Sequence, residues 1–262
     1  MRPPSKTSKP LAKPSPPEHI RLNKHIADSG LCSRRKADAL IAEGRVKVNG
    51  RAVSEAGQKI NPAKDVIIVD GRHLPEPGRK IYLLFHKPKG VVSTRHDERG
   101  RKTIYDCLPA DCHKADPAGR LDRESSGALV LSSDGDFINK ITHPRYHVEK
   151  TYSVTTDKPV SLPHLKKLLS GVLLMPENKQ ARFESIEHLE KSHYRVVLIT
   201  GYNRQIRRSL ELLGYKIKSL KRTGFGPVSL GNLRAGETRR LTPAEIKALV
   251  SYSKTTVKKR PE

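Results

Sequence analysis

Residues 119–131 have the sequence Gly-Arg-Leu-Asp-Arg-Glu-Ser-Ser-Gly-Ala-Leu-Val-Leu, in which a polar turn runs directly into an apolar segment. The apolar half predicts a buried strand over Ala128–Ser132. A strand end is a rigid place from which to aim a side chain into a cleft, and Asp122 occupies that position. The alternative is that Asp122 only caps the turn or pairs with Arg120. The rest of the chain decides between these two interpretations.

The overall charge points to the class of partner. The chain has 262 residues and a formal net charge of +24, from 51 Lys and Arg against 27 Asp and Glu. An excess of this size predicts a polyanionic partner, and nucleic acid is the usual one. No apolar run reaches the length of a membrane span, and no secretory signal is recognisable. We therefore expect a cytoplasmic protein that binds nucleic acid and does not enter a membrane.

The cysteines do not favour a metal centre. Cys32, Cys107 and Cys112 make an odd count without a C-x-x-C pair. Cys107, Cys112 and His113 are conceivable metal ligands, but a fourth ligand and the usual spacing are missing. Free thiols in a reducing compartment fit better, so no metal site is expected.

Composition divides the chain into two folded domains between two basic tails. Residues 1–17 are rich in Pro, Ser and Lys and are expected to be disordered. Residues 251–262 repeat this basic character and form a second tail. Residues 73–80 contain a Pro/Gly segment of the linker type. The two domains are therefore expected at residues 18–72 and 81–250.

The first domain is predicted to contain two short helices followed by strands. Ser33 is a good N-cap for the second helix, and Gly44 follows its end. Val46-Lys47-Val48 then alternates like a strand, and Asn49-Gly50 is a hairpin signal. Three cations, Arg34–Lys36, occupy the first turn of the second helix, where they oppose the helix dipole. This placement suggests an external anion, although a solvated charge cluster explains it equally well.

These features resemble an S4 RNA-binding domain. The resemblance rests on Arg21–Lys24, Ser33–Ala37 and Gly44–Gly50, which follow one another in the order of that family. It implies that the second helix faces an RNA backbone. The RNA contacts that it implies in this domain are Arg21, Arg34, Arg35, Lys36 and Lys47.

The second domain is predicted to mix strands and helices. Strands are expected at Ile81–His86, Ala128–Ser132, Tyr152–Thr155, Phe183–Leu189 and Tyr194–Ile199. Asp134 and Asn203 are predicted N-caps, and Thr242 with Glu245 makes a capping box for the last helix. The leucines of residues 162–169 form a helical stripe that is expected in the core. Strands in runs with few βαβ crossovers favour an α+β fold, with a mixed but mostly antiparallel sheet flanked by helices.

Three segments of this domain could carry chemistry. Besides Asp122, they provide Tyr152 on a strand and Arg207 near the start of a helix. A carboxylate that stays ionised in a closed pocket needs a nearby cation, and the helix N-terminus adds positive potential around Arg207. A base held outside its stack needs a flat partner, which Tyr152 can offer. Alternatively, Tyr152 is a core aromatic and the arginines of this helix contact phosphates.

Together these segments resemble the RsuA family of pseudouridine synthases. The matching motifs are Phe85–Thr94, Gly119–Asp122, Lys150–Val154 and Asn203–Arg208, which correspond to the opening strand, the catalytic loop, the aromatic strand and the arginine helix of that family. Gly135-Asp136 and Asn139-Lys140-Ile141 point further, to the RluF-like branch that acts on a uridine in 23S rRNA.

The resemblance implies isomerisation of uridine to pseudouridine without a cofactor. The expected partner is structured RNA, either 23S rRNA or its precursor, with tRNA as a second candidate, and the enzyme is expected to be a monomer. Asp122 is then the essential carboxylate, Tyr152 stacks on the flipped base, and Arg207 pairs with Asp122. Whether Asp122 attacks C1′ or removes a ribose proton stays open. The RNA contacts expected in this domain are Arg120, Arg204 and Arg208.

Two other functions are compatible with the sequence. A non-catalytic RNA-binding protein fits the charge equally well and predicts binding without pseudouridine. A nucleoside-cleaving hydrolase also fits, because a carboxylate near C1′ could admit water. Such hydrolases usually need a second carboxylate, for which Glu124 is the nearest in sequence. Release of free uracil from RNA distinguishes the hydrolase from the isomerase.

Overall fold

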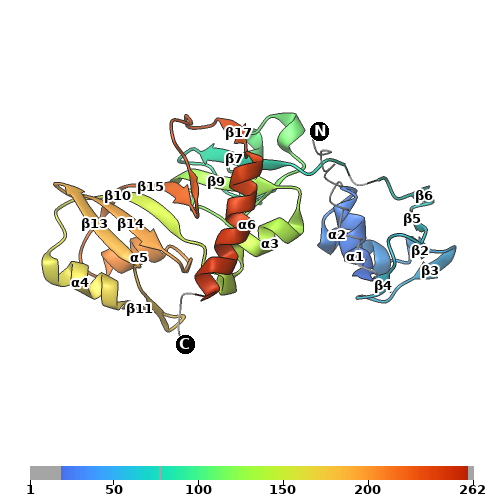
Figure 1. The fold of residues 1–262 in the computed structure, drawn as a ribbon, viewed down its shortest axis with the longest axis horizontal. Coiled ribbons are helices and arrows are strands. Elements are labelled where there is room, and N and C mark those ends of the chain that lie inside the picture. The colour runs from blue at the N-terminus through green and yellow to red at the C-terminus, as the bar shows by residue number, and fades with distance from the viewer. Residues whose placement is uncertain (1–18, 77, 259–262) are drawn as a thin grey trace, which may run out of the picture. The chain divides into compact units, whose positions relative to one another are not determined.

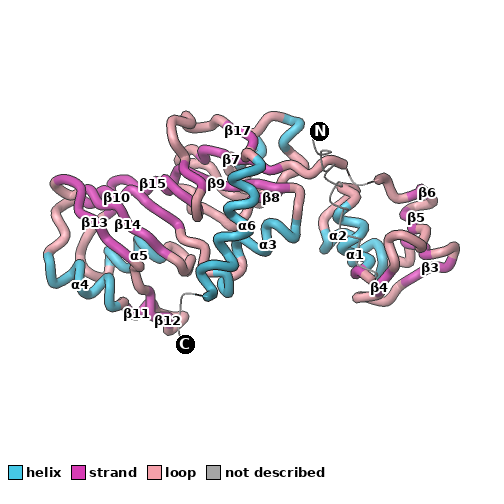
Figure 2. Tube along the Cα trace, viewed as in Figure 1, coloured by secondary structure: helices cyan, strands magenta, loops and turns pink. Residues whose placement is uncertain are grey.

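The computed structural model describes residues 19–76 and 78–258. These residues form two compact units that divide between Arg79 and Lys80. Figure 1 traces the chain, and Figure 2 distinguishes its helices and strands. The predicted disordered tail at residues 1–17 lies outside the described residues. Each unit is considered by itself below.

The N-terminal unit packs two helices against short strands. The helices are α1 (Leu22–Asp28) and α2 (Arg34–Ala42). The Ser33 side chain accepts a hydrogen bond from the backbone N–H of Lys36, so the predicted N-cap is confirmed. The strands are β1 (Ile20–Arg21), β2 (Val46–Val48), β3 (Arg51–Val53), β4 (Lys59–Ile60), β5 (Ile67–Val69) and β6 (Arg72–His73). One sheet has the order β3-β2-β5-β6, and β1 pairs with β4.

The predicted hairpin joins β2 and β3. Asn49 and Gly50 have φ values of 51° and 82°, as the two central residues of a type I′ turn require. The unit also extends beyond the expected boundary at residue 72. His73 pairs with Ile68, and Leu74 packs against the core of this unit, so the first residues of the predicted linker belong to the fold.

The C-terminal unit is built on one large sheet (Figure 2), and most of its neighbouring strands are antiparallel. Its main strands follow the order β13-β14-β10-β15-β9-β7-β17, in which β9 and β15 run parallel. The strands are β7 (Tyr82–Lys87), β8 (Asp116–Pro117), β9 (Ser126–Ser132), β10 (Lys150–Thr156), β13 (Ser185–Glu190), β14 (His193–Leu198), β15 (Ile217–Phe225), β16 (Val228–Ser229) and β17 (Thr238–Arg240). A separate pair is formed by β11 (Val172–Leu174) and β12 (Lys179–Ala181). This topology confirms the α+β class.

Helices cover different parts of this sheet. They are α3 (Gly135–Thr142), α4 (Leu162–Ser170), α5 (Gln205–Glu211) and α6 (Pro243–Lys258). Short 3₁₀ turns occur at Ile104–Asp106, Ala110–Cys112 and Pro144–Tyr146. In Figure 1, α3 and α6 lie side by side near β9, while α4 and α5 lie beside β13 and β14. Two hydrophobic clusters fill these interfaces. Within the described ranges, no helix is long and apolar enough to cross a bilayer.

Several local predictions can be compared with these elements. Asp134 caps α3, and Thr242 and Glu245 exchange backbone and side-chain hydrogen bonds at the start of α6, as predicted. The leucine stripe is only partly in the core. Leu168 is buried, but Leu162 is 74% exposed because the outer side of α4 has no covering element among the described residues.

Two boundaries differ from the sequence interpretation. Asn203 does not cap α5: its N-cap position belongs to Arg204, which has a left-handed backbone and no capping side-chain bond. In addition, α6 continues to Lys258, so much of the predicted tail at residues 251–262 is helical, and its last residues, 259–262, lie outside the described part. Tyr252 packs against the cluster between α6 and the sheet, which explains why the helix does not stop at residue 250.

Gly127 sets the closest contact between β9 and β15. Its φ is +111°, and a Cβ added there would lie 2.1 Å from the carbonyl oxygen of Arg222. The two residues are partners in the parallel register. Only glycine therefore lets these strands pair, and this pairing fixes the strand that follows Asp122.

Candidate active site

Asp122 lies in the turn that leads into β9. The backbone N–H of Ser125 donates to the Asp122 carbonyl oxygen at 3.0 Å and closes this turn. The Asp122 side chain is half-buried, whereas Ser125 is 2% exposed. We refer to residues 121–125 as the catalytic turn, after the role that the family resemblance predicts for Asp122. Its position at the end of a buried strand agrees with the interpretation of the sequence.

Two buried cations hold the catalytic turn by its main chain. Arg207 on α5 donates from Nη2 to the Glu124 carbonyl oxygen at 2.8 Å. Lys87 at the end of β7 donates from Nζ to the Ser125 carbonyl oxygen at 2.8 Å. Lys87 is fully buried and Arg207 is 9% exposed. The turn is therefore clamped between α5 and β7 mainly through its main chain, and a longer bond of 3.5 Å joins Arg207 to the Ser125 hydroxyl.

The electrostatics of these two cations connect them to Asp122. Burial lowers the pKa of Lys87 to about 8, and the negative charge of Asp122 opposes that shift. Burial also lowers the pKa of Arg207, and Arg204 adds to this effect while Asp122 again opposes it. Both side chains remain mostly protonated at neutral pH. Positive charge therefore lies next to the carboxylate.

A cavity of about 440 Å³ brings the three predicted catalytic residues together. Asp122, Tyr152 and Arg207 all line it, with the catalytic turn on one side and β10 and the start of α5 on others. The implied pairing of Asp122 with Arg207 needs correction, because the described residues contain no ion pair between them. The guanidinium instead donates to the carbonyl oxygen of Glu124, and it acts on Asp122 through its charge and by holding the turn.

Tyr152 presents an aromatic surface to this cavity from the middle of the sheet. It is 9% exposed and pairs with Val196 on β14 and Arg222 on β15. Its neighbours Thr151 and Ser153 point to the opposite face of the sheet, because side chains alternate along a strand. Tyr152 is therefore held rigidly by strands on both sides.

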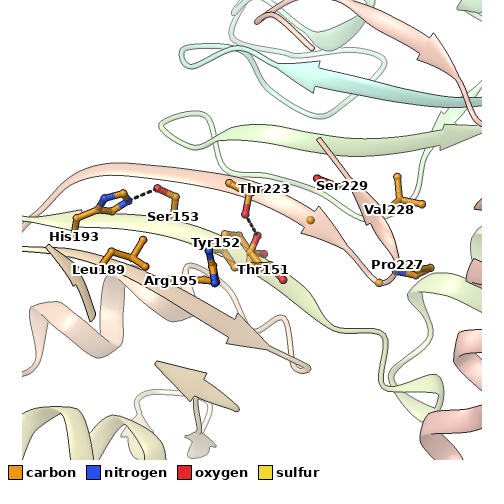
Figure 3. Close-up of a pocket in the computed structure, with 12 residues that line it drawn as sticks. Thr151, Tyr152, Ser153, Leu189, His193, Arg195, Thr223, Pro227, Val228 and Ser229 are labelled. Carbon is orange, nitrogen blue, oxygen red and sulfur yellow. Dashed lines mark hydrogen bonds between the residues drawn. The ribbon is translucent and has the colours of Figure 1, made fainter. Parts of the chain in front are cut away.

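The opposite face of β10 carries a second hollow of about 460 Å³ (Figure 3). Five of its twelve lining residues bear hydroxyls, Tyr152 among them, and Ser153 Oγ lies 2.8 Å from His193 Nε2. Arg195 is also part of this lining, but it is engaged with Glu187 at 2.6 Å. Neither Asp122 nor Arg207 contributes to this hollow, so the predicted chemistry belongs to the cavity on the other face.

Sequence reasoning missed two further cations that line the 440 Å³ cavity, which we call the active cavity after the three predicted residues that it brings together. Lys150 donates to the carbonyl oxygens of Val148 and Ile199, and burial lowers its pKa to about 8, with Arg222 adding to the shift. Arg222 is 2% exposed and donates to the Ala128 carbonyl oxygen. The sequence does contain a signal for both cations. Each lies on the strand face that also carries apolar residues, Lys150 with Val154 and Arg222 with Leu220, and a cation on that inward face must be buried.

The predicted RNA contacts of the C-terminal unit differ in availability. Arg120 and Arg204 line the active cavity. Arg208 is instead engaged with Glu177 at 2.7 Å and with the Met175 carbonyl oxygen. Its predicted contact with RNA would require these interactions to break.

In the N-terminal unit, the predicted RNA contacts are exposed. Arg34 makes one long hydrogen bond of 3.4 Å to the Asn23 side chain. Arg21, Arg35, Lys36 and Lys47 also lie on the surface of this unit. We refer to Arg34, Arg35 and Lys36 as the α2 cations. They are free to approach a phosphate backbone, and their contact with RNA stays a prediction.

The cysteine and histidine side chains show no metal-like grouping in the described ranges. His113 Nε2 lies 3.0 Å from the Leu108 carbonyl oxygen, and Cys112 is close to Asp111. All three cysteines are free.

Comparison with known proteins identifies the family. Residues 81–212 match the family model described as RNA pseudouridylate synthase, and this span includes Asp122, Tyr152 and Arg207. The chain belongs to the RNA pseudouridylate synthase family. It is therefore an isomerase that acts on RNA. Residues 20–67 match the S4 domain, which confirms the prediction for the N-terminal unit.

Similar proteins cover most of this enzyme. Ribosomal large subunit pseudouridine synthase B of Bacillus subtilis is 39% identical, over 87% of this chain and 95% of the relative. Dual-specificity RNA pseudouridine synthase RluF of Escherichia coli K12 is 37% identical, over 88% of this chain and 78% of the relative. A crystal structure of a pseudouridylate synthase aligns with a TM-score of 0.66 and 32% identity, covering 88% of this chain and 100% of that one.

Proposed function

We propose that this enzyme converts a specific uridine of large-subunit (23S) ribosomal RNA to pseudouridine, with Asp122 as the essential carboxylate and tRNA as a second candidate substrate. The observation that carries the proposal is the shared cavity of Asp122, Tyr152 and Arg207. The ribosomal substrate is supported by the names of the relatives, one a ribosomal large subunit enzyme and one of dual specificity.

The reaction exchanges one bond to C1′ for another. The N1–C1′ bond breaks, the uracil turns within the cavity, and C5 bonds to C1′. C5 loses its proton and N1 gains one, so no redox partner is needed. Asp122 either attacks C1′ or removes a ribose proton, and both roles require an ionised carboxylate beside the sugar.

The surrounding residues suit the retention of a detached base. Tyr152 offers a flat surface held by two strands, against which an extruded uracil can stack. Ile206 of the same cavity is 4% exposed and adds apolar packing. Lys87 and Arg207 keep the catalytic turn in place while the base turns. A base confined in this way rebonds to C1′ before water can replace it.

The direct test is to map pseudouridine across the 23S rRNA and tRNA of cells with and without this protein. We expect one or a few large-subunit positions to lose pseudouridine when the protein is absent. Purified enzyme should restore them in RNA from the deficient cells. Binding without product would support the non-catalytic alternative, and released uracil would support the hydrolase.

Substitution of Tyr152 tests stacking. Tyr152→Ala should lower kcat/KM by about 10- to 100-fold, because one base–aromatic stack contributes about 1–3 kcal/mol. Tyr152→Phe should lose much less, since the ring remains. Single-turnover conversion of the mapped RNA measures both variants. A larger loss in the Phe variant than in the Ala variant would show that the hydroxyl, and not the ring, is important.

Neutralising the α2 cations tests the role of the S4 domain. Their simultaneous change to Gln should weaken RNA binding and make log K fall less steeply with log salt, by about one unit of slope for each lost phosphate contact. Filter binding over a range of salt concentrations measures the slope. The matched control changes three other exposed cations of the same unit to Gln: Lys59, Lys64 and Arg72. Equal slopes in the two triple variants would favour the solvated-cluster interpretation.

The proposal also includes a cytoplasmic monomer, since its substrate is ribosomal RNA and its charge opposes self-association. Sedimentation of the purified protein at physiological salt measures the mass directly. A stable dimer would contradict this part of the proposal.

A further inference from the structure

A third space, a hollow of about 480 Å³, adjoins the active cavity. Arg120, Leu121, Asp122 and Arg204 line both spaces, so the two meet at the catalytic turn. The rest of the lining of this 480 Å³ hollow comes mainly from residues 92–101. We call this space the arginine hollow, and residues 93–102 the arginine loop.

The arginine loop is an organised segment. Val92 and Thr103 form a β-bridge at its base, and the backbone N–H of Val92 donates to the Lys102 carbonyl oxygen at 2.9 Å. Inside the loop, the Asp97 carboxylate accepts hydrogen bonds from the backbone N–H groups of Arg99 and Arg101, and from the Arg101 guanidinium at 2.6 Å. The Asp97 side chain is only 7% exposed. Asp97 therefore fixes the backbone from which Arg99 projects.

The same loop is fastened to the catalytic turn. The buried Ser93 hydroxyl donates to the Leu121 carbonyl oxygen at 2.9 Å and accepts from the Leu121 backbone N–H at 3.2 Å. The backbone N–H of Gly90, just before the loop, donates to the Arg123 carbonyl oxygen at 2.7 Å. The arginine loop and Asp122 are thus parts of one rigid assembly.

The charges around the hollow favour an anion. Its lining contains five arginines against three carboxylates: Arg99, Arg101, Arg120, Arg123 and Arg204, with Asp97, Glu98 and Asp122. Asp97 is occupied by Arg101. The side chains of Arg99, Arg120 and Arg204 have no hydrogen bond or ion pair within the described part of the chain. Three unengaged guanidinium groups therefore surround a space that opens on Asp122.

We propose that the arginine hollow binds a phosphodiester group flanking the target uridine, with Arg99 as a contact and Asp97 as its positioning residue. This inference rests on the proposed function, because it places the RNA strand on both sides of the catalytic turn. The base enters the active cavity while the neighbouring phosphate remains in the hollow. Guanidinium groups bind phosphate strongly and in a defined geometry, so this contact sets the position of C1′ relative to Asp122.

The experiment uses RNA hairpins that span the mapped uridine and carry one neutral methylphosphonate linkage each. With the wild-type enzyme, neutralising one flanking linkage should raise both KM and the binding Kd by about tenfold. Arg99→Gln should cause a similar increase with unmodified RNA. On RNA that carries the same neutral linkage, Arg99→Gln should raise KM and Kd little further, because the phosphate charge that Arg99 contacts is already absent. Arg240→Gln, on the edge strand β17, is the control, because it removes one positive charge as Arg99→Gln does.

The proposed contact would be overturned if the effects of Arg99→Gln and of each neutral linkage on Kd were simply additive. It would also be overturned if Arg99→Gln weakened binding no more than Arg240→Gln does. Binding is measured alongside pseudouridine formation. A wild-type enzyme that binds the hairpin without product would contradict the proposed function, whereas the linkage-specific effect on Kd would still decide the phosphate contact.

Asp97→Asn separates positioning from simple charge. Removing a carboxylate makes the hollow more positive, so charge alone predicts tighter RNA binding. A positioning role predicts the opposite: Asp97→Asn should bind unmodified RNA several-fold more weakly than the wild type. This difference should again disappear on RNA with the neutral linkage. Tighter binding with an unchanged linkage pattern would remove Asp97 from this role.

Discussion

Asp122→Asn is expected to lower turnover by at least about 10³-fold, equivalent to roughly 4 kcal/mol of activation free energy. The amide has nearly the same shape but can neither attack C1′ nor accept a ribose proton. The catalytic turn should keep its position, because Arg207 and Lys87 hold it through main-chain carbonyl groups. Single-turnover conversion of the mapped RNA measures the loss.

RNA affinity provides the control for this variant. The Kd should stay within a few-fold of the wild-type value, since no predicted RNA contact is removed. Asp111→Asn, an exposed acid in a 3₁₀ turn of the same unit, should retain full activity. Near-normal turnover in the Asp122 variant would exclude Asp122 as the essential carboxylate.

Gly127→Ala is expected to destabilise the C-terminal unit by about 4 kcal/mol, a large fraction of the stability of an ordinary domain. The added Cβ would lie 2.1 Å from the Arg222 carbonyl oxygen, and the φ of +111° is unfavourable for alanine. The parallel β9–β15 pairing must then open. Urea unfolding of the full chain, followed by the tyrosine signal of this unit, measures the change.

Gly135→Ala is the matched control. Gly135 starts α3, has no positive φ, and has no atom within 4 Å of an added Cβ. This variant should therefore unfold at the wild-type urea concentration or slightly above it. Equal midpoints for the two alanine variants would contradict the argument that the β9–β15 contact depends on glycine.

Much of the fold was predictable because its signals are local. Asn49-Gly50 specifies a turn with two positive φ values, and Ser33 and Asp134 each satisfy the backbone of the helix that follows. These effects need no knowledge of distant residues. The alternation of residues 152–155 likewise predicted the strand that carries Tyr152.

Predictions that depended on tertiary contacts were less successful. Asn203 has the right chemistry for an N-cap, but the Gln205 side chain accepts hydrogen bonds from Tyr202 N–H and Thr200 Oγ1 and shapes this turn instead. Leu162 has the right spacing for a core position, yet nothing in the described chain covers it. Neither the hydrogen bonds of Gln205 nor the lack of a covering element over Leu162 can be predicted from a short stretch of sequence.

The residue types and their local settings made Asp122, Tyr152 and Arg207 candidates, but it was the family resemblance that favoured grouping them in one site. The three residues come from segments distant in sequence, and no local rule joins them. Lys87 and Lys150 were missed because lysines are almost always exposed, and burial is a property of the assembled sheet.

The catalytic turn is held through hydrogen bonds to its backbone, and this has an evolutionary consequence. The shortest hydrogen bond to this turn from each of Arg207, Lys87, Gly90 and Ser93 ends on a backbone atom, which every amino acid possesses. Replacements at Glu124 therefore leave these bonds in place, and a replacement at Arg123 removes its 3.3 Å side-chain bond to the Gly90 carbonyl oxygen but none of these four. We expect these two positions to diversify freely among descendants of this enzyme, so that new RNA targets can be acquired without rebuilding the chemistry.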